Sequence, residues 1–241
     1  MREMGKRRAL GQHYLVDQSI VQLMIKTSGI KQDERVLEIG TGKGVLTERL
    51  CELSAHVEAF ELDDANYLAT KSRVDKGLAL HLGDAFSARP IFDVLVSSLP
   101  YSESSNFVEW LSQRNYDRAI VILQKEFAEK LMSEPRKRSY RAISAIFQMS
   151  SSIEVIAEVD RVSFAPPPRV SSVVAVIKPR ETITSRQIRL VKMLFSQKKR
   201  KLGVALKRLG FDDKKVTPEQ LSRRVWDLSA LEIGDILGIA A

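Results

Sequence analysis

Glu38-Ile39-Gly40-Thr41-Gly42-Lys43-Gly44 is the stretch that most clearly indicates the fold of this 241-residue chain. The stretch ends a short apolar run, residues 35–39, and leads into a segment of helical period, residues 46–53. Glycines at such a junction let the backbone turn tightly and let a ligand approach it closely. The stretch therefore predicts a nucleotide-binding turn between the first strand of an α/β sheet and its helix.

Strand and helix patterns alternate from residue 35 to residue 178, which is typical of an open α/β sheet. Further apolar or β-branched runs predict strands at 56–62, 79–82, 94–97, 119–123, 154–159 and 172–177, with helices at 65–74, 106–113 and 141–150. Only the Pro-rich loop Phe164-Ala165-Pro166-Pro167-Pro168-Arg169 separates the last two strands, and it is too short for a crossover helix. We therefore expect a mostly parallel, Rossmann-like sheet that ends in an antiparallel hairpin.

No strand pattern returns after residue 178, and the apolar residues keep a helical period from Ile188 to Leu209. We place a boundary near residues 179–184. The sequence thus predicts two domains: residues 1–180 form a ligand-binding catalytic domain, and residues 181–241 form a small helical domain.

The spacing of the glycines indicates which ligand the turn binds. A dinucleotide-binding turn reads GxGxxG, whereas here the third glycine, Gly44, comes one residue early and Glu38 precedes the first. This spacing favours S-adenosylmethionine as the ligand of the turn, and Gly40 and Gly42 are the expected contacts. A dinucleotide is the alternative.

Two acidic residues, one at the end of the predicted strand 56–62 and one just after the strand 79–82, lie at positions that suit the same ligand. Glu61 lies 21 residues after Gly40, a usual distance for an acid that accepts from both ribose hydroxyls. A surface carboxylate is the alternative interpretation of Glu61. Asp84, in Gly83-Asp84-Ala85, offers an acceptor for an adenine amine, although this tripeptide alone is a weak signal.

The stretch at the end of the fourth strand, Ser97-Ser98-Leu99-Pro100-Tyr101, indicates a site that binds the methyl-accepting group. The exocyclic amine of a base is a poor nucleophile because its lone pair is delocalised into the ring. Acceptors at the two amine protons draw the nitrogen toward a tetrahedral shape, and an aromatic face holds an extruded base. The Ser98 hydroxyl, the Leu99 carbonyl and the Tyr101 ring would supply these parts, whereas a plain strand-ending turn is the alternative.

Positive charge is concentrated near the carboxyl terminus. The chain has a net charge of +8, and residues 186–215 alone hold eleven Lys or Arg and two Asp. Such a concentration indicates a polyanionic partner, because each neutralised phosphate releases counterions, and a solvated helix face is the alternative. The expected RNA-binding residues are Lys198, Lys199, Arg200, Lys201, Lys207 and Arg208. A second basic cluster, Lys130 with Arg136, Lys137, Arg138 and Arg141, is expected to extend that surface.

The remaining composition excludes several classes of protein. One cysteine, Cys51, rules out an internal disulfide, and the three histidines are too scattered for a metal site. No apolar run reaches the roughly 18 residues that span a bilayer, and the amino terminus lacks an apolar signal-peptide core. We therefore expect a cytoplasmic protein with no bound metal and no membrane partner.

Seven motifs, in order, resemble those of the small-subunit rRNA adenine dimethyltransferases, relatives of the macrolide-resistance rRNA methyltransferases. The resemblance covers the chain from Gly11 to about Leu202. The motifs are GQHYLVD (11–17), LEIGTGKGVLT (37–47), FELD (60–63), GDA (83–85), SLPY (98–101), QKEFAE (124–129) and VSFAPPPRVSSVV (162–174).

The resemblance implies roles for individual residues. It places His13 and Leu15 at the methionine end of the donor S-adenosylmethionine, Gly40 along the donor, Glu61 on the ribose and Asp84 on the adenine. It places Ser98, Leu99 and Tyr101 around the target amine, with Ser98 also bordering the donor and Phe164 as a second aromatic against the base.

The implied activity is the transfer of two methyl groups to the N6 amine of each of two adjacent adenosines near the 3′ end of small-subunit rRNA. The implied partners are this RNA and the pre-ribosomal small subunit. We expect the protein to act in ribosome biogenesis as a monomer.

Two departures from the family pattern leave alternatives open. The family usually has Asn at the position of Ser98, and a further Asn near Leu202, where this chain reads Gly203-Val204-Ala205. The shorter Ser98 allows a ribosome-assembly RNA-binding factor with weak or no methylation activity. A nicotinamide oxidoreductase is disfavoured by the glycine spacing and by the lack of an obvious proton-transfer residue after the fourth strand.

Overall fold

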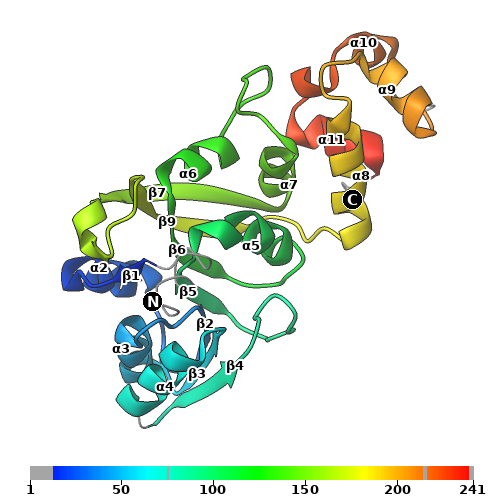
Figure 1. Cartoon of the computed structure of the whole chain (residues 1–241). Coiled ribbons are helices and arrows are strands. Elements are labelled where there is room, and N and C mark those ends of the chain that lie inside the picture. Colours follow the sequence, from blue (N-terminus) through cyan, green and yellow to red (C-terminus); the bar gives the residue numbers. More distant parts are fainter. Residues whose placement is uncertain (1–12, 75, 214–215, 239–241) are drawn as a thin grey trace. The chain divides into compact units, whose positions relative to one another are not determined.

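The computed structural model describes residues 13–74, 76–213 and 216–238, which fold into two compact units (Figure 1). The first unit contains the described residues of 1–107, 115–127 and 153–178, and the second contains those of 108–114, 128–152 and 179–241. Gly11 and Gln12 of the amino-terminal motif lie outside the described residues.

A seven-stranded sheet forms the centre of the first unit, in the order β4-β3-β2-β5-β6-β9-β7. Its strands are β2 (Arg35–Ile39), β3 (His56–Glu61), β4 (Leu78–Leu82), β5 (Val94–Ser98), β6 (Arg118–Gln124), β7 (Ser151–Val159) and β9 (Ser172–Pro179). The strands from β4 to β6 are parallel, and β9 is antiparallel to β6. This confirms the predicted fold class. The chain order changes direction between β2 and β5, and ligands of open α/β sheets bind at such a switch point.

Three helices lie in a row against the sheet. Helix α2 (Gln18–Ser28) packs on β5 and β6, α3 (Val45–Leu53) on β3, and α4 (Asp64–Arg73) on β3 and β4. Burial of their apolar side chains against the strands holds the layers together. This core includes Val21, Met24, Leu46, Leu50, Val36, Val57, Val94, Val96, Ile120 and Ile122.

A two-stranded pair that the sequence did not predict joins distant parts of the chain. Strand β1 (Tyr14–Leu15) pairs antiparallel with β8 (Phe164–Ala165), so that Leu15 lies opposite Phe164. The Asp17 carboxylate accepts from the Ser163 hydroxyl at 2.8 Å and from the Ser19 amide at 2.9 Å, and the second bond caps α2. The amino-terminal motif is thereby fastened to the Pro-rich loop.

The second unit is helical. It contains α7 (Ala142–Ser150), α8 (Ser185–Ser196), α9 (Leu202–Leu209), α10 (Pro218–Ser222), the 3₁₀ turn η3 (Val225–Asp227) and α11 (Ala230–Leu237). Four further helical segments complete the list of elements: η1 (Tyr101–Glu103), α5 (Ser104–Leu111), α6 (Lys125–Leu131) and η2 (Arg161–Ser163).

The division into units differs from the single boundary that the sequence suggests. The chain enters the second unit for the last time at Pro179, close to the expected boundary, but that unit also takes residues 108–114 and 128–152. Its core explains why: Tyr140, Ile146 and Met149 pack with Val191 and Leu194 of α8 in one buried cluster. The helical unit is therefore assembled from separate parts of the chain. No helix within the described ranges is long and apolar enough to cross a membrane.

Candidate active site

Three neighbouring hollows in the first unit share residues and follow the carboxyl ends of β2, β3 and β5. The largest, about 460 Å³, is lined by Glu61, Asp84 and Phe86; two smaller ones, about 60 and 80 Å³, are lined by His13, Tyr14 and Ser98. All three hollows border Gly40. The structure thus brings together most of the residues that the sequence assigns to the methyl donor.

The glycine turn has a backbone that only glycine adopts readily. Gly40 has φ 78° and Gly42 has φ 55°, both in the left-handed region. A side chain at Gly42 would also place its Cβ 3.1 Å from the Tyr14 ring. The turn therefore needs its glycines both for the shape of the backbone and for the close approach of Tyr14.

Glu61, the expected ribose ligand, is buried and supports the glycine turn. One carboxylate oxygen accepts from the Gly42 amide at 2.8 Å and lies 3.4 Å from the Thr41 hydroxyl, and the other accepts from the Leu62 and Asp63 amides. Burial raises the pKa of Glu61, against the opposing effect of these backbone amides. The sequence indicated the position of this acid at the cleft but not its bonds to the turn.

Glu38 is a buried acid that the sequence did not assign to the site. It lines the same hollow as His13 and Leu15, and its Oε2 atom has no hydrogen-bond partner in the structure. Burial, with the nearby charge of Glu61, raises the pKa of Glu38 to about 8. An unpaired carboxyl oxygen beside the expected methionine end suits a cationic ligand with hydrogen-bond donors, such as the ammonium group of methionine, because its positive charge would favour the ionised, accepting form of Glu38. Its position two residues before Gly40, the first glycine of the turn, is the sequence feature that could have placed Glu38 in the site.

Asp84 lies at the other end of the cleft. It accepts from the Phe86 amide and the Ser87 hydroxyl, both at 2.9 Å, and it remains exposed. Phe60 borders the same hollow and stacks on His81 with 4.8 Å between ring centroids. Apolar walls beside an acidic acceptor are suited to an adenine ring.

Ser98, Leu99 and Tyr101 all line the hollow next to Gly40, as the sequence predicts for an amine-binding site. Ser98 is half-buried, and its hydroxyl makes no hydrogen bond to another described residue. Pro100 fixes the backbone after Leu99 with φ −58° and ψ 129°.

Tyr101 is held at two points. Its hydroxyl lies 2.5 Å from the hydroxyl of Ser172, the fully buried first residue of β9, and its ring lies 5.6 Å from the His13 ring. His13 in turn lies 2.7 Å from the Pro166 carbonyl through Nδ1. Burial raises the pKa of the Tyr101 phenol, against the opposing effect of its hydrogen bond with Ser172. Ser172 lies inside a motif that the sequence singled out, but nothing in that motif predicted its partner.

Phe164 also borders the hollow at Tyr101 and is 2% exposed. Its pairing with Leu15 places it there. Two aromatic side chains from distant motifs thus line the same small hollow.

The expected RNA-binding residues lie in the second unit. Lys199, Arg200, Lys201, Lys207 and Arg208 are exposed. Lys198 is half-buried, and its ammonium lies 3.4 Å from the Tyr140 carbonyl and 5.4 Å from the centre of the Trp226 ring. Lys198 therefore contacts residues that are distant in sequence, whereas the Arg200 guanidinium donates to the nearby Gln197 side chain, at 3.0 Å.

A family model for ribosomal RNA adenine dimethylases matches residues 4–236. The chain belongs to the ribosomal RNA adenine dimethylases. It is 33% identical, over 95% of its length and 89% of the relative's, to a protein of Methanothermobacter thermautotrophicus named probable ribosomal RNA small subunit methyltransferase A.

Solved structures of other proteins share the fold of this chain. A dimethyladenosine transferase of Plasmodium falciparum superposes with a TM-score of 0.79 at 25% identity, over 93% of this chain and 96% of that one. The 23S rRNA methyltransferase ErmE shares the fold, with a TM-score of 0.65 at 21% identity over 93% and 99% of the two chains. The cleft described above is therefore the candidate active site of a ribosomal RNA adenine dimethylase.

Proposed function

We propose that this protein transfers methyl groups from S-adenosylmethionine to the N6 amines of two adjacent adenosines near the 3′ end of small-subunit rRNA. One observation supports this most: the hollow at the carboxyl end of β5 joins the glycine turn to Ser98, Leu99 and Tyr101. A methyl donor beside the turn and a base amine beside Ser98 would then meet. The proposal includes action in ribosome biogenesis, as a cytoplasmic monomer, on the pre-ribosomal small subunit.

The residues of the cleft suit this donor. Gly40 and Gly42 leave the backbone open, Glu61 and Asp84 provide acceptors for the ribose and adenine, and Glu38 offers a buried acceptor beside His13 and Leu15. When bound, the donor supplies a methyl group on a positively charged sulfur, which is a good leaving group.

The protein contributes position more than acid–base chemistry. The Ser98 hydroxyl and Leu99 carbonyl accept from the amine protons, so the nitrogen lone pair points toward the methyl carbon as the C–S bond breaks. Tyr101 and Phe164 hold the base. The proton released from nitrogen leaves to solvent, and alignment of donor and nucleophile supplies most of the acceleration.

The direct test incubates purified protein with labelled donor and unmethylated small subunits and then maps the modified nucleotide. We expect dimethyladenosine at two adjacent positions. Donor binding without any methylation would contradict the proposal and favour an RNA-binding assembly factor, the alternative that Ser98 leaves open.

Variants of Ser98 test its role in the proposed reaction. Ser98→Ala is expected to lower the methylation rate more than it weakens donor binding, because the contact acts mainly in the transition state. Ser98→Asn is expected to hold or raise the rate. Single-turnover kinetics and isothermal titration measure the two effects, and an unaltered rate in Ser98→Ala would show that the backbone carbonyl orients the amine without this side chain.

A further inference from the structure

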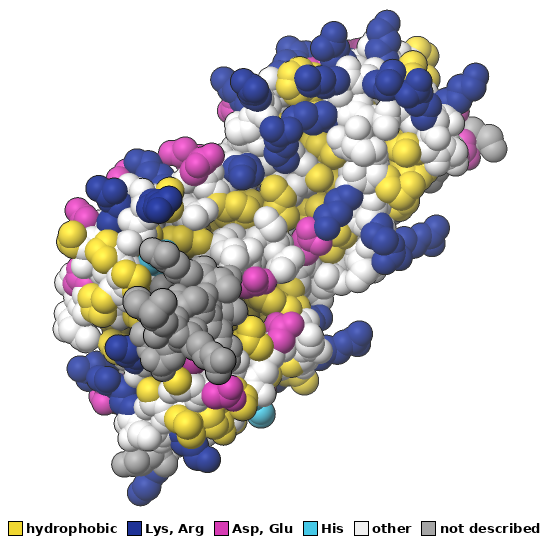
Figure 2. Space-filling model, viewed as in Figure 1, with side chains coloured by type: hydrophobic (Ala, Val, Ile, Leu, Met, Phe, Trp, Pro, Cys, Tyr) yellow, Lys and Arg dark blue, Asp and Glu magenta, His cyan; other side chains and the backbone are white. Residues whose placement is uncertain are grey.

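We propose that Lys43 binds the carboxylate at the amino-acid end of the methyl donor and so helps the protein to select a donor that carries this group. The inference rests on the proposed function in taking S-adenosylmethionine as the donor. It concerns one cation of the first unit, distinct from the Lys and Arg side chains that Figure 2 shows crowded over the region of α8 to α11. Neither the glycine spacing nor the family resemblance assigned a role to Lys43.

Lys43 borders the hollow at the expected methionine end of the donor. This hollow, of about 80 Å³, is also lined by His13, Leu15 and Glu38. Lys43 is exposed, and its ammonium lies 5.4 Å from the centre of the Tyr14 ring, which lines the same hollow. A cation over an aromatic face is attracted to that face. The contact with Tyr14 therefore holds the charge of Lys43 beside the hollow.

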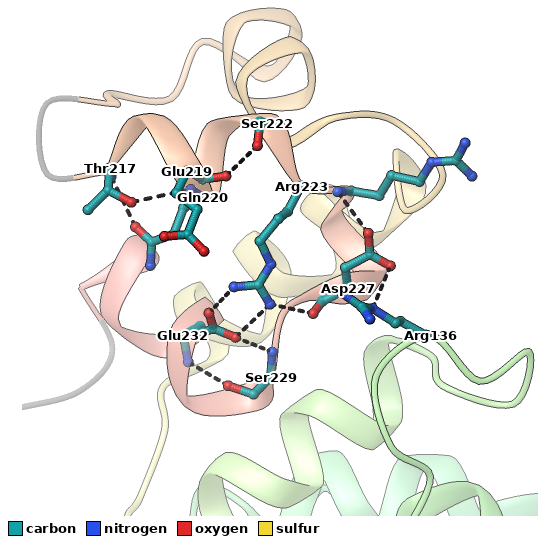
Figure 3. A network of polar contacts seen from close by, with 10 residues as sticks. Arg136, Thr217, Glu219, Gln220, Ser222, Arg223, Asp227, Ser229 and Glu232 are labelled. Atoms are coloured by element: carbon teal, nitrogen blue, oxygen red, sulfur yellow. Dashed lines mark hydrogen bonds and ion pairs between the residues drawn. The ribbon is translucent and has the colours of Figure 1, made fainter.

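Lys43 differs from the cations that stabilise the fold itself. In the second unit, Arg223 is paired with Glu232 (Figure 3). In the first unit, Arg73 is paired with Glu48 of α3 at 2.8 Å, so Glu48 already has a partner. Within the part of the chain that the structure describes, no carboxylate is paired with Lys43. Its charge is therefore available to a ligand that carries a carboxylate.

The start of α3 adds to the attraction for an anion at this place. Helix α3 begins at Val45, directly after its cap residue Gly44, and no side chain caps its first turn. Val45 and Leu46 of this first turn line the same hollow as Lys43. The amides at the start of a helix carry partial positive charge and favour an anion. Lys43 and the helix start therefore both bring positive potential to the hollow.

Glu38 gives the same hollow a group of opposite charge. It is 1% exposed, and its Oε2 atom has no hydrogen-bond partner in the structure. The amino-acid end of the donor carries an ammonium and a carboxylate on one carbon, so a site for it needs an acceptor and a cation in the same hollow. Glu38 supplies the acceptor and Lys43 the cation, whereas the apolar Leu15 and Val45 suit the methylene groups of the donor. The hollow therefore favours an end that carries both charges.

The test compares two donors, S-adenosylmethionine and its decarboxylated form, which keeps the ammonium and the sulfonium but lacks the carboxylate. Isothermal titration without RNA gives the affinity of each donor for the full-length wild type, Lys43→Met and Lys43→Arg. Methionine keeps an unbranched side chain against Tyr14 and removes the charge. The matched control is Lys71→Met. Lys71 is also exposed, its ammonium lies 5.9 Å from the centre of the Tyr67 ring, and it lines none of the three hollows.

Lys43→Met is expected to bind S-adenosylmethionine about tenfold more weakly than the wild type, because it loses a charge-assisted contact. The same variant is expected to bind the decarboxylated donor no more weakly than the wild type, because that donor has only positive charges at this end. Lys43→Arg keeps a cation and is expected to retain most of the wild-type preference for the carboxylate. Lys71→Met is expected to keep the wild-type affinity for both donors.

The comparison of the two donors distinguishes a contact with the carboxylate from an indirect effect of the substitution. If Lys43→Met weakens the binding of both donors by the same factor, Lys43 acts through the shape of the glycine turn and the inference is wrong. Unchanged affinity for both donors would also overturn the inference, because the carboxylate would then be bound by other groups. Equal melting temperatures would show that all the variants fold.

Methylation by the wild-type protein, measured on small subunits, separates this inference from the proposed function. A loss of affinity confined to S-adenosylmethionine, together with no methylation, would support the carboxylate site and contradict the proposed function. Methylation together with equal donor affinities in the wild type and Lys43→Met would overturn the inference alone. A wild-type protein that binds neither donor would contradict both.

Discussion

The hydrogen bond between Tyr101 and Ser172 changes what is expected of the Tyr101 ring. From the sequence alone, Tyr101→Phe keeps the aromatic face and is expected to be tolerated. In the structure, however, the same change leaves the fully buried Ser172 hydroxyl without its partner. We therefore expect Tyr101→Phe to lower the free energy of unfolding by about 1–3 kcal/mol and to slow methylation.

A double-mutant cycle tests this assignment. Replacing both partners, in Tyr101→Phe with Ser172→Ala, is expected to recover part of the lost stability, because no buried hydroxyl then remains unpaired. Urea unfolding gives the stabilities, and the ratio of monomethyl to dimethyl product reports the position of the base. A Tyr101→Phe protein with wild-type stability and product ratio would contradict the role of Ser172.

Glu38 is expected to make stability depend on pH. Its pKa rises from an ordinary 4.5 to about 8 in the folded protein, so between these values the native state keeps a proton that the unfolded chain releases. The contribution of Glu38 is therefore complete below about pH 4.5 and is lost as pH rises toward 8. Glu38→Gln should remove this component, so that its free energy of unfolding falls less steeply over this range than that of the wild type. If the free energy of unfolding depends on pH in the same way in both proteins, Glu38 does not contribute this pH dependence.

At the scale of elements, the end of β3 and the glycine turn form one cooperative piece. The Glu61 carboxylate accepts from Gly42 on one side and from Leu62 and Asp63 on the other, so it supports the turn and also borders the donor site. Glu61→Gln places an amide donor near one of these backbone donors. We expect it to reduce the free energy of unfolding by about 1–3 kcal/mol and also to weaken donor binding.

Asp84→Asn is the matched comparison for Glu61→Gln. Asp84 is exposed, and its two hydrogen bonds lie within its own turn. The Asp84→Asn substitution is therefore expected to weaken donor binding with little change in the free energy of unfolding. Chemical unfolding and isothermal titration on both variants check this, and a Glu61→Gln protein with unchanged stability would mean that the turn does not depend on this acid.

At the scale of the whole molecule, the composition of the second unit decides which truncations are useful. Removal of residues 184–241 looks harmless from the sequence, because it leaves the predicted sheet complete. The structure shows that Tyr140, Ile146 and Met149 would lose the α8 residues that bury them. We expect the truncated protein to aggregate and to bind a hydrophobic dye, because a large apolar cluster becomes exposed.

Size-exclusion chromatography and dye fluorescence check this expectation. The full-length Lys199→Gln with Lys201→Gln protein serves as the control, because it loses charge but keeps the core. A truncated protein that stays monodisperse and melts at the wild-type temperature would show that residues 128–152 do not need the carboxyl-terminal helices.

Local sequence patterns were sufficient to predict the strands of the seven-stranded sheet, the glycine turn and the two acids at or just after strand ends. These features depend on periodicity and turn chemistry, as Gly40 and Gly42 show with their left-handed backbones. The family motifs added the positions of Ser98, Leu99 and Tyr101, which the structure brings to one hollow.

The meeting of distant residues depends instead on the tertiary fold. The pairing of Tyr14–Leu15 with Phe164–Ala165 involves strands too short to have a pattern, and the partner of Tyr101 lies 71 residues away. Lys198 and Lys199 are neighbours of the same type, yet only Lys198 is half-buried against Tyr140 and Trp226. Burial and partnership depend on contacts between parts of the chain that are far apart, and no local pattern in the sequence records those contacts.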